Sequence, residues 1–326
     1  MSVNALIVHG GAPTAVINAS LYGAIHEIKK YKEIGSFYAA IGGAGAVLRE
    51  QFVDLKKISE EKLSMLPYTP ASAIGTSRDP LEQPEYDRIA EILVKWNIRY
   101  VFFNGGNGSM DTCGKVYEAC RRIGKEISVV GIPKTIDNDI SVTDHAPGFG
   151  SAAKYIAASV REISQDVRAL PIHVSVVEAM GRNAGWLTGA AVLAKSEDCE
   201  GPDLIYLPEV DFDMEQFLAD VHRIYEEKNN VLIAVSEGIH YADGSFVSEA
   251  KASATDGFGH AQLGGLAARL AQVIKEHEHA KVRGIELSLL QRAGAHLASQ
   301  TDIDEAFAAG KMAVEAALSG ETGKMV

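Results

Sequence analysis

The feature that most constrains the fold is an alternation of short, β-branched runs with amphipathic stretches of helical spacing. Several of the runs are apolar on successive residues, which suits strands that are buried on both faces of a sheet. Strands that alternate with helices predict a parallel sheet covered by helices, so we expect an α/β fold. The expected strands are residues 5–9, 37–41, 100–104, 127–132, 173–178, 231–236 and 282–289.

The chain has 326 residues, enough for two domains. Residues 144–152 are rich in turn formers and precede a helical pattern that runs from Ala153 to about Asp166, so we expect the first crossing between domains there. We expect the second crossing near residues 291–294, which makes the first domain discontinuous. The expected domains are residues 1–146 with 292–326, and residues 147–291.

Composition excludes several classes of function. The net charge is −12 and no run of Lys or Arg is long enough to neutralise a row of phosphates, so we expect no binding to nucleic acid. Three scattered cysteines are too few for a disulfide framework and favour a reducing compartment. The chain lacks eighteen successive apolar residues, so we expect a cytoplasmic protein without a membrane partner.

Glycine-rich segments follow two of the expected strands. Ligands of parallel sheets bind at the carboxyl ends of the strands, where helix N-termini offer free amides to anions. Gly10 and Gly11 follow the first strand, and Gly105, Gly106 and Gly108 follow the strand at residues 100–104. Missing β-carbons let the backbone approach a phosphate closely, although such loops also occur where a chain merely turns.

The segment that follows the strand at residues 127–132 carries charged side chains. Asp137 and Asp139 are two residues apart, and Lys134 stands near them. One carboxylate could accept a proton while the other holds a metal or a hydroxyl group, and the lysine could meet a phosphate. The structural alternative is an Asx-type turn that caps the next helix.

The second half of the chain places arginine and glutamate near strand ends. A guanidinium group matches phosphate oxygens and would suit a sugar phosphate. The alternatives are surface ion pairs for the arginines and a simple turn for the Glu-Gly pair. The residues concerned are Met180, Gly181, Arg182, Glu237, Arg283 and Arg292.

These segments, taken in order, resemble a known family. They read GGAPTAVINAS, GTSRDP, GGNGSMDT, PKTIDND, TDHAPGFGSA, MGRNAGW, SEG and QRAG. The set is similar to the phosphofructokinase family, which phosphorylates the 1-hydroxyl of fructose 6-phosphate, and several flanking strings resemble its pyrophosphate-using branch. The resemblance implies two Rossmann-like, three-layer domains with largely parallel sheets and the active site in the cleft between them. The first domain would bind the phosphoryl donor and the second the sugar phosphate.

The resemblance also implies catalytic roles at matching positions. Asp137 would be the general base that takes the proton from the sugar hydroxyl, while Thr135 and Asp139 hold the acceptor. Asp139 and Asn107 would help to bind Mg²⁺. Lys134 would supply positive charge to the transferred phosphoryl group.

The implied sugar-phosphate site comprises Met180, Gly181, Arg182, Glu237 and Arg292. Arg283 matches an arginine that the family supplies from a neighbouring subunit, so we expect a homodimer or homotetramer with shared active sites.

Two positions near this site depart from the family's pattern. His173 stands where many bacterial members have another intersubunit arginine, and Leu289 replaces a sugar-site histidine. The exact sugar is therefore less firmly implied than the reaction.

The donor site implied by the resemblance comprises Gly11, Arg78, Gly106, Asn107, Gly108 and Ser109. Pyrophosphate users place an acidic side chain at the position of Gly108, whereas nucleotide users have glycine there, which leaves room for ATP. Lys134 and Asn107 instead resemble the pyrophosphate branch. An acidic side chain at position 108 would exclude ATP directly through its volume and charge, and Gly108 has no such side chain. We therefore expect ATP as the donor, with pyrophosphate as the alternative.

Two rivals belong to other classes. One is a sugar-phosphate or nucleotide sensor that does not catalyse a reaction, which the joint presence of Thr135, Asp137, Asp139 and Arg182 disfavours. The other is a dehydrogenase of similar fold, which the lack of a dinucleotide fingerprint at the first strand disfavours.

Overall fold

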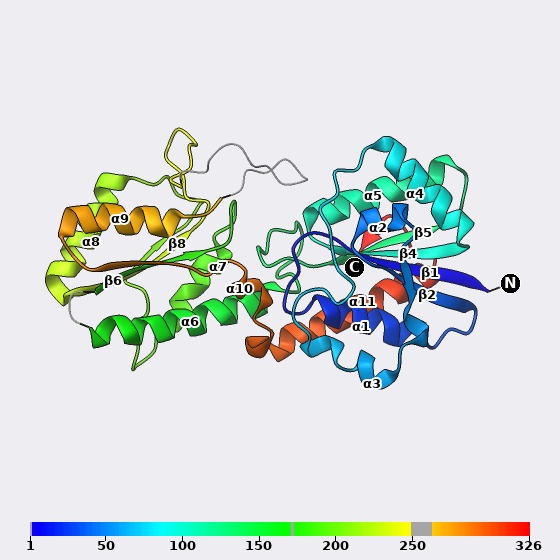
Figure 1. Ribbon diagram of the computed structural model, residues 1–326, viewed down its shortest axis with the longest axis horizontal. Helices are drawn as coiled ribbons and strands as arrows, with labels where there is room; N and C mark the ends of the chain where they lie inside the picture. The colour runs from blue at the N-terminus through cyan, green and yellow to red at the C-terminus, as the bar shows by residue number, and fades with distance from the viewer. Residues whose placement is uncertain (1, 171–172, 249–262) are drawn as a thin grey trace. The chain divides into compact units, whose positions relative to one another are not determined.

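The computed structural model describes residues 2–170, 173–248 and 263–326 (Figure 1). The chain divides into two compact units, which are described separately. Unit 1 comprises Met1–Ser151 and Ala293–Val326, and unit 2 comprises Ala152–Arg292. The first division lies five residues beyond the expected one, because the first turn of the helix that begins at Phe149 is hydrogen-bonded to unit 1. The second division differs from the expected one by a single residue.

Unit 1 contains a sheet in the order β10-β5-β4-β1-β2-β3. Its pairs are parallel except for β2 with β3, which is antiparallel. The strands are β1 (Val3–His9), β2 (Ile34–Ala40), β3 (Phe52–Asp54), β4 (Ile98–Gly105), β5 (Ser128–Pro133) and β10 (Lys324–Met325).

Helices cover both faces of this sheet. Alternate residues of β1 face opposite layers, with Leu6 and Val8 packed in one core and Ala5 and Ile7 in the other. The first core lies under α4 and α5 and the second under α1 and α11 (Figure 1). The helices are α1 (Ile17–Ile28), α2 (Ala44–Leu48), α3 (Glu60–Leu63), α4 (Gln83–Lys95), α5 (Asn107–Arg122) and α11 (Gln300–Leu318), with 3₁₀ turns η1 (Leu55–Lys57), η2 (Leu66–Tyr68) and η4 (Ala295–Leu297).

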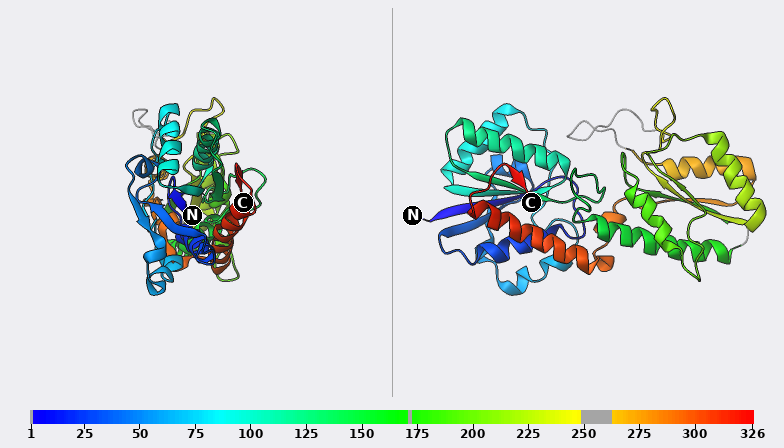
Figure 2. Two further views of the ribbon diagram at one scale, coloured as in Figure 1. Left: turned by 90° about the vertical axis from the view of Figure 1, so that its right-hand side faces the viewer. Right: turned by 180° about the vertical axis from the view of Figure 1, so that it is seen from behind.

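Unit 2 contains a parallel sheet in the order β7-β8-β6-β9. Val174 and Val176 of β6 pack with residues of α8 and α9 on one face, and α6 lies on the other (Figures 1 and 2). The elements are α6 (Phe149–Ala169), β6 (His173–Ala179), α7 (Trp186–Gly189), η3 (Ala190–Ala194), β7 (Leu204–Tyr206), α8 (Met214–Lys228), β8 (Asn230–Ser236), α9 (Leu266–Glu278), β9 (Val282–Glu286) and α10 (Leu290–Ala293).

The prediction of an α/β fold with largely parallel sheets is confirmed. Each of the seven expected strands is present, but the prediction that the last one continues to residue 289 was wrong. It ends at Glu286, because Leu290 N donates to Leu287 O and Ser288 takes a φ of 43°, which starts a turn. Sequence reasoning missed β3, β7 and β10, which have only two or three residues and so show no periodicity.

Every helix in the part of the chain that the structure describes is too short or too polar to cross a membrane.

Helices α1 and α11 lie side by side and approach closely at two glycines (Figures 1 and 2). A β-carbon added to Gly310 would lie 2.8 Å from the carbonyl carbon of Ser20 and 3.0 Å from the amide nitrogen of Ala24. A β-carbon added to Gly23 would lie 2.9 Å from the carbonyl carbon of Phe307. Because the obstacles are backbone atoms, the helices would have to separate to accept larger residues.

We therefore expect Gly310→Ala to lower the free energy of unfolding by about 1–3 kcal/mol, because overpacking outweighs the higher helix propensity of alanine. The control is Gly114→Ala in α5, where an added β-carbon would meet no atom within 4 Å. That variant should gain up to about 1 kcal/mol. Denaturant titration of both variants measures the difference, and equal or greater stability of Gly310→Ala would contradict the close helix contact.

Candidate functional site

Three loops meet at the carboxyl edge of the sheet in unit 1. The strands β1, β4 and β5 are neighbours in register, with His9 opposite Asn104 and Gly105 opposite Pro133. The backbone continues this pairing beyond the strands, since Gly10 N donates to Asn104 O at 2.9 Å and Lys134 N donates to Gly105 O at 3.0 Å. The segments that follow these strands therefore lie side by side.

Glycines in two of these loops make room for Ser109, the third residue of α5. A β-carbon on Gly10 would lie 3.1 Å from the β-carbon of Ser109, and one on Gly105 would lie 3.0 Å from Gly10 O as well as against Ser109. Gly11 has a φ of +72°. A β-carbon added to it would lie 3.8 Å from Lys134 Nζ and 3.9 Å from Ser109 Oγ. The glycines thus allow one close-packed junction of loops.

The start of α5 offers backbone amides at this junction. Gly106 is the N-cap residue, and no side chain forms a capping hydrogen bond there among the described residues. Asn107 and Gly108 form the first turn, and Ser109, which follows them, is 5% exposed. An uncapped helix N-terminus presents N–H groups and a positive dipole, which suits an anion.

Lys134 brings a buried positive charge to the same junction. Its side chain is 3% exposed and donates a hydrogen bond to Ala12 O in the first glycine loop. Burial lowers the pKa of His9, at the end of β1, to about 3, and the charge of Lys134 acts in the same direction. His9 is therefore neutral at physiological pH and bonds to Ser72 Oγ through Nδ1 at 2.8 Å. Of these two side chains, Lys134 and not His9 thus carries the positive charge.

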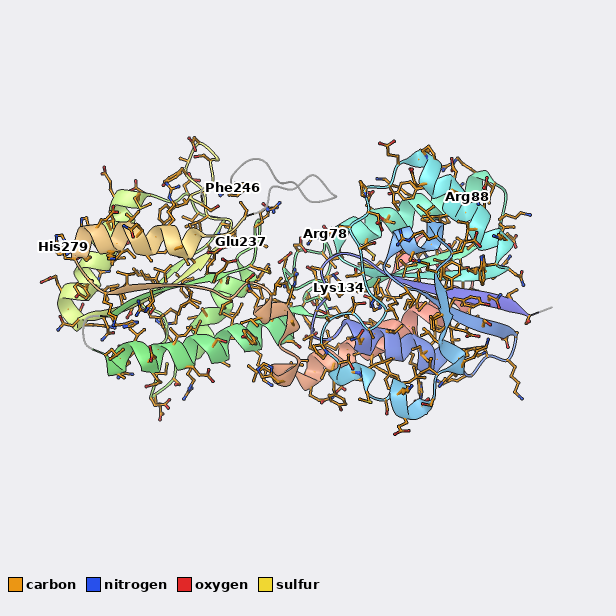
Figure 3. The ribbon with its side chains drawn as sticks, in the orientation of Figure 1. Arg78, Arg88, Lys134, Glu237, Phe246 and His279 are labelled. Carbon is orange, nitrogen blue, oxygen red and sulfur yellow. The ribbon has the colours of Figure 1, made fainter. Side chains whose placement is uncertain are left out.

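Arg78 reaches this region from the segment that follows Ser77. Gly11 N donates to Ser77 O at 3.0 Å, and Thr76 Oγ1 donates to Gly11 O at 2.7 Å, which fixes this segment beside the first glycine loop. Arg78 and Lys134 lie toward the end of unit 1 that is remote from the N-terminus (Figure 3). Arg78 is exposed, whereas Lys134 is buried.

The loop at residues 134–139 is organised by the hydroxyl of Thr135. Thr135 Oγ1 accepts from Asp137 N at 3.0 Å and lies 3.5 Å from Asp139 Oδ1, to which it donates. Asn107 Nδ2 donates to Asp139 Oδ2 at 2.9 Å. This is a turn closed by threonine, and the next helix begins only at Phe149, so the Asx-type helix cap considered above is not formed. Asp137 is half-buried and Asp139 is exposed.

Asn138 holds this loop in place and was missed by sequence reasoning. It takes a φ of 54°, in the left-handed region that asparagine tolerates better than most residues. Its Oδ1 accepts from Ala146 N at 2.9 Å and its Nδ2 donates to Asp144 O at 3.2 Å. The position of an asparagine between two aspartates was the only signal in the sequence.

Asp139 and Asn107 are the residues of this loop region that could hold a divalent cation. They offer a carboxylate and an amide group in contact with each other. Mg²⁺ commonly binds one or two carboxylates and takes its other ligands from phosphates and water, so this pair fits such an ion. Among the described residues there is no group of three or more His, Cys, Asp and Glu side chains arranged to hold a metal.

In unit 2 the segments that follow β6 and β8 meet. Gly181 N donates to Glu237 Oε1 at 3.2 Å, and Ser236 Oγ donates to Gly181 O at 2.5 Å. A β-carbon on Gly238 would lie 2.5 Å from the carbonyl carbon of Arg182, so the two segments are in backbone contact. The structure thus brings together Met180, Gly181, Arg182 and Glu237.

Arg292 joins this region through its neighbour in α10. Gln291 is 1% exposed, and its Oε1 accepts from Met180 N at 3.1 Å while its Nε2 donates to Ser288 O at 3.0 Å. Gln291 therefore ties α10, with the half-buried Arg292, to the segment after β6. The QRAG motif contained Gln291, but sequence reasoning gave a site role to Arg292 alone, because nothing in the local sequence shows that the Gln291 amide reaches Met180.

Arg283 lies elsewhere in unit 2. It is exposed on the edge strand β9 opposite Ser175, five positions before Met180 along β6. At the rise of a strand this places it about 16 Å from that segment. Arg283 instead lines a cavity of about 400 Å³, together with Glu162, Ile163, Asp166, His173, Ser175 and Ile285. Within one chain Arg283 is therefore separate from the Met180–Glu237 group.

Glu178 is a buried carboxylate just before that group. It is 1% exposed on β6, and its Oε2 accepts from Ala267 N, near the start of α9, at 2.8 Å. Burial raises its pKa to about 7 from the usual 4.5, and the charges of Glu286 and Glu237 raise it further against the amide hydrogen bonds. Glu178 thus changes its protonation state near neutral pH.

Comparisons with known proteins give a consistent result. A family model described as "Phosphofructokinase" matches residues 4–317. A pyrophosphate–fructose 6-phosphate 1-phosphotransferase of Halomonas elongata is 41% identical over 99% of this chain and 78% of its own length, and one of Xanthomonas campestris is 44% identical over 97% and 77%. The crystal structure of a pyrophosphate-dependent phosphofructokinase from Nitrosospira multiformis matches with a TM-score of 0.87 and 38% identity, over 98% of this chain and 77% of that one.

The raised pKa of Glu178 predicts a pH-dependent stability. The folded protein holds a proton on Glu178 between about pH 4.5 and 7 that the unfolded chain has lost, so stability from this group is complete below pH 4.5 and is lost as the pH rises through about 7. Glu178→Gln removes this dependence. Its stability relative to the parent should rise by about 3 kcal/mol across that interval.

Denaturant titrations between pH 4.5 and 8 measure this difference. The control is Glu227→Gln on α8, which removes the same charge from an exposed position. A difference between Glu178→Gln and the parent that stays constant with pH would contradict the raised pKa.

Proposed function

We propose that this chain, which belongs to the phosphofructokinase family, transfers a phosphoryl group from pyrophosphate to the 1-hydroxyl of fructose 6-phosphate. Membership of the family rests on the match over residues 4–317. The catalytic part of the proposal rests on the junction of loops in unit 1, at the ends of three neighbouring strands. A glycine loop follows β1, the uncapped amides of α5 follow β4, and the buried Lys134 and a loop with two aspartates follow β5.

Phosphoryl transfer requires positive charge around the phosphate oxygens and a base near the attacking hydroxyl more than covalent help from the protein. In the proposed mechanism Asp137 accepts the proton of the sugar hydroxyl as the hydroxyl oxygen attacks one phosphorus of pyrophosphate. The bond from that phosphorus to the bridging oxygen breaks, and orthophosphate leaves. Lys134 and the amides at the start of α5 neutralise charge on the donor, and Arg78 adds a second cation there. Thr135 keeps Asp137 in place through the hydrogen bond to its amide.

The proposed cation is Mg²⁺, held by Asp139 with help from Asn107. When bound, it would neutralise negative charge on the donor phosphates. The amide of Asn107 donates to Asp139, which fixes one carboxylate oxygen and leaves the Asn107 carbonyl oxygen as a second, weaker ligand.

The proposed acceptor site lies in unit 2. Met180, Gly181, Arg182 and Glu237 would bind the sugar phosphate, with Arg292 supported by Gln291. Arg283 would serve the site of a neighbouring subunit, since in its own chain it is about 16 Å from Met180 along the sheet. The proposal therefore includes a homo-oligomer. Its proposed compartment is the cytoplasm.

Pyrophosphate is the donor that the relatives support, whereas the sequence-based expectation was ATP. Relatives of 41%, 42% and 44% identity have names that specify pyrophosphate, and this supports the alternative better than the ATP reading. Asn107 and Lys134 point in the same direction. One observation favours ATP as a second candidate: Gly108 carries no acidic side chain that would fill the space of a nucleotide phosphate.

Turnover of fructose 6-phosphate with each donor and Mg²⁺ tests the choice. We expect turnover with pyrophosphate in the absence of ATP, and weaker or no turnover with ATP. Gly108→Asp should leave pyrophosphate use intact and suppress any use of ATP through charge repulsion and lost space. Turnover with ATP but not with pyrophosphate would overturn the proposed donor. The absence of turnover with either donor would overturn the proposed reaction. Other ketose phosphates serve as acceptor controls.

Asp137→Asn tests the proposed base. Loss of a general base should lower kcat by about 10²–10⁴-fold with a much smaller change in KM for fructose 6-phosphate. Asp111→Asn in α5 is the matched control, because it removes an exposed carboxylate whose partner is Lys115. Steady-state kinetics and circular dichroism of both variants give the answer. A folded Asp137→Asn protein with parental kcat would remove Asp137 from the mechanism.

A further inference from the structure

Helix α11 begins with a buried carboxylate that the proposed mechanism does not use. Asp302 is 3% exposed and accepts three hydrogen bonds from one short segment of chain. Gly148 N donates to its Oδ1 at 2.9 Å, and both Ser151 N and Ser151 Oγ donate to its Oδ2, at 2.9 and 2.5 Å. Ser299 N, just before α11, donates in turn to Ser151 Oγ at 3.1 Å.

The segment that Asp302 binds is in contact with the loop at residues 134–139. Thr135 N donates to Pro147 O at 3.2 Å, and Thr135 pairs with Gly148 as an isolated bridge. Asn138 binds the same segment through Ala146 N. The carboxylate, residues 146–148 and the 134–139 loop therefore form a continuous chain of hydrogen bonds.

Gly148 shows how little freedom this arrangement has. It takes a φ of +114°, and an added β-carbon would lie 3.0 Å from Thr135 O and 2.9 Å from the β-carbon of Thr14. The backbone here is thus packed directly against the loop on one side, while Asp302 holds its amide on the other. A shift of Gly148 would move Thr135, whose hydroxyl binds the amide of Asp137.

A carboxylate is well suited to this position. Gly148 N and the two donors of Ser151 approach different oxygens of Asp302, and hydrogen bonds to an ionised acceptor are roughly twice as strong as neutral ones. The negative charge also lies at the start of α6, where the helix dipole favours it. An asparagine of the same size offers one oxygen and one NH₂ group, so it would set a donor against a donor on one side.

We propose that Asp302 is a positioning residue for phosphoryl transfer, which acts through residues 146–148 on Thr135 and Asp137. It does not touch the reacting groups in this account. The expected effect on kcat rests on the proposed function. The expected effect on the position of the 134–139 loop rests on the hydrogen bonds alone. Asp302 lies more than 150 residues after the loop that it supports.

The test compares Asp302→Asn with Asp304→Asn, which makes the same change at an exposed position two residues further along α11. Asp304 accepts a hydrogen bond from Gln300 Nε2 of the same helix at 2.8 Å. Asp302→Glu, which keeps the carboxylate, is the conservative variant. Ser151→Ala removes one donor to Asp302 and leaves the Gly148 bond intact. Kinetics are measured well below the melting temperature of every variant.

A displacement of about 1 Å at reacting groups can cost about 10²-fold in rate, so Asp302→Asn should lower kcat by about 10–100-fold with a much smaller change in KM for fructose 6-phosphate. Ser151→Ala should show a smaller loss, Asp302→Glu should recover part of the rate, and Asp304→Asn should match the parent. Hydrogen exchange supplies a readout without turnover: the amides of residues 134–138 and of Ala146 and Gly148 should exchange faster in Asp302→Asn than in Asp304→Asn.

The outcomes separate the two proposals. If the parent turns over neither donor, the proposed function fails, and faster exchange in the loop of Asp302→Asn still supports the positioning role. Parental kcat in folded Asp302→Asn, or a lowered kcat with unchanged exchange at residues 134–138, would overturn the positioning role. If Asp302→Asn fails to fold, Ser151→Ala decides by the same two measurements.

Discussion

Parallel pairing of β1, β4 and β5 in one register is the constraint on which the candidate site depends. It brings His9, Gly105 and Pro133 to one edge of the sheet, so that a glycine loop, the start of α5 and the 134–139 loop become neighbours. Gly10 and Gly105 then allow Ser109 to pack between them. Residues far apart in sequence thus meet without any of the loops having to be long.

Charge at this edge is arranged in a definite way. Lys134 is buried against the first glycine loop, and burial together with this lysine keeps His9 neutral, so that the positive charge is not shared with the imidazole. The carboxylates follow in the same loop, where Asn107 donates to the Asp139 side chain and the Thr135 hydroxyl accepts from the backbone amide of Asp137. In the proposed mechanism, the group that meets the anionic donor and the proton acceptor therefore stand at separate positions within residues 134–139.

Sequence patterns predicted the part of this account that depends on local composition. Apolar runs located the main strands, and the ordered motifs located the family and the loops. They could not predict contacts that depend on the tertiary fold, such as Asp302 with Gly148 or Gln291 with Met180, because neither pair has a shared pattern. Gly10 and Gly105 were interpreted as room for phosphate, but much of that room is taken by Ser109, which only the packing of α5 reveals. The expectation of ATP as the donor gave Gly108 more weight than Lys134 and Asn107, whereas the names of the relatives favour pyrophosphate.

The central claim is that the edge formed by β1, β4 and β5 binds the phosphoryl donor. A crystal structure of the protein with pyrophosphate and Mg²⁺ tests it most directly. The account predicts phosphate oxygens within hydrogen-bonding distance of Lys134 Nζ and of the backbone amides in the first turn of α5. Pyrophosphate bound at another place, with Lys134 still turned to Ala12 and no phosphate near α5, would contradict it.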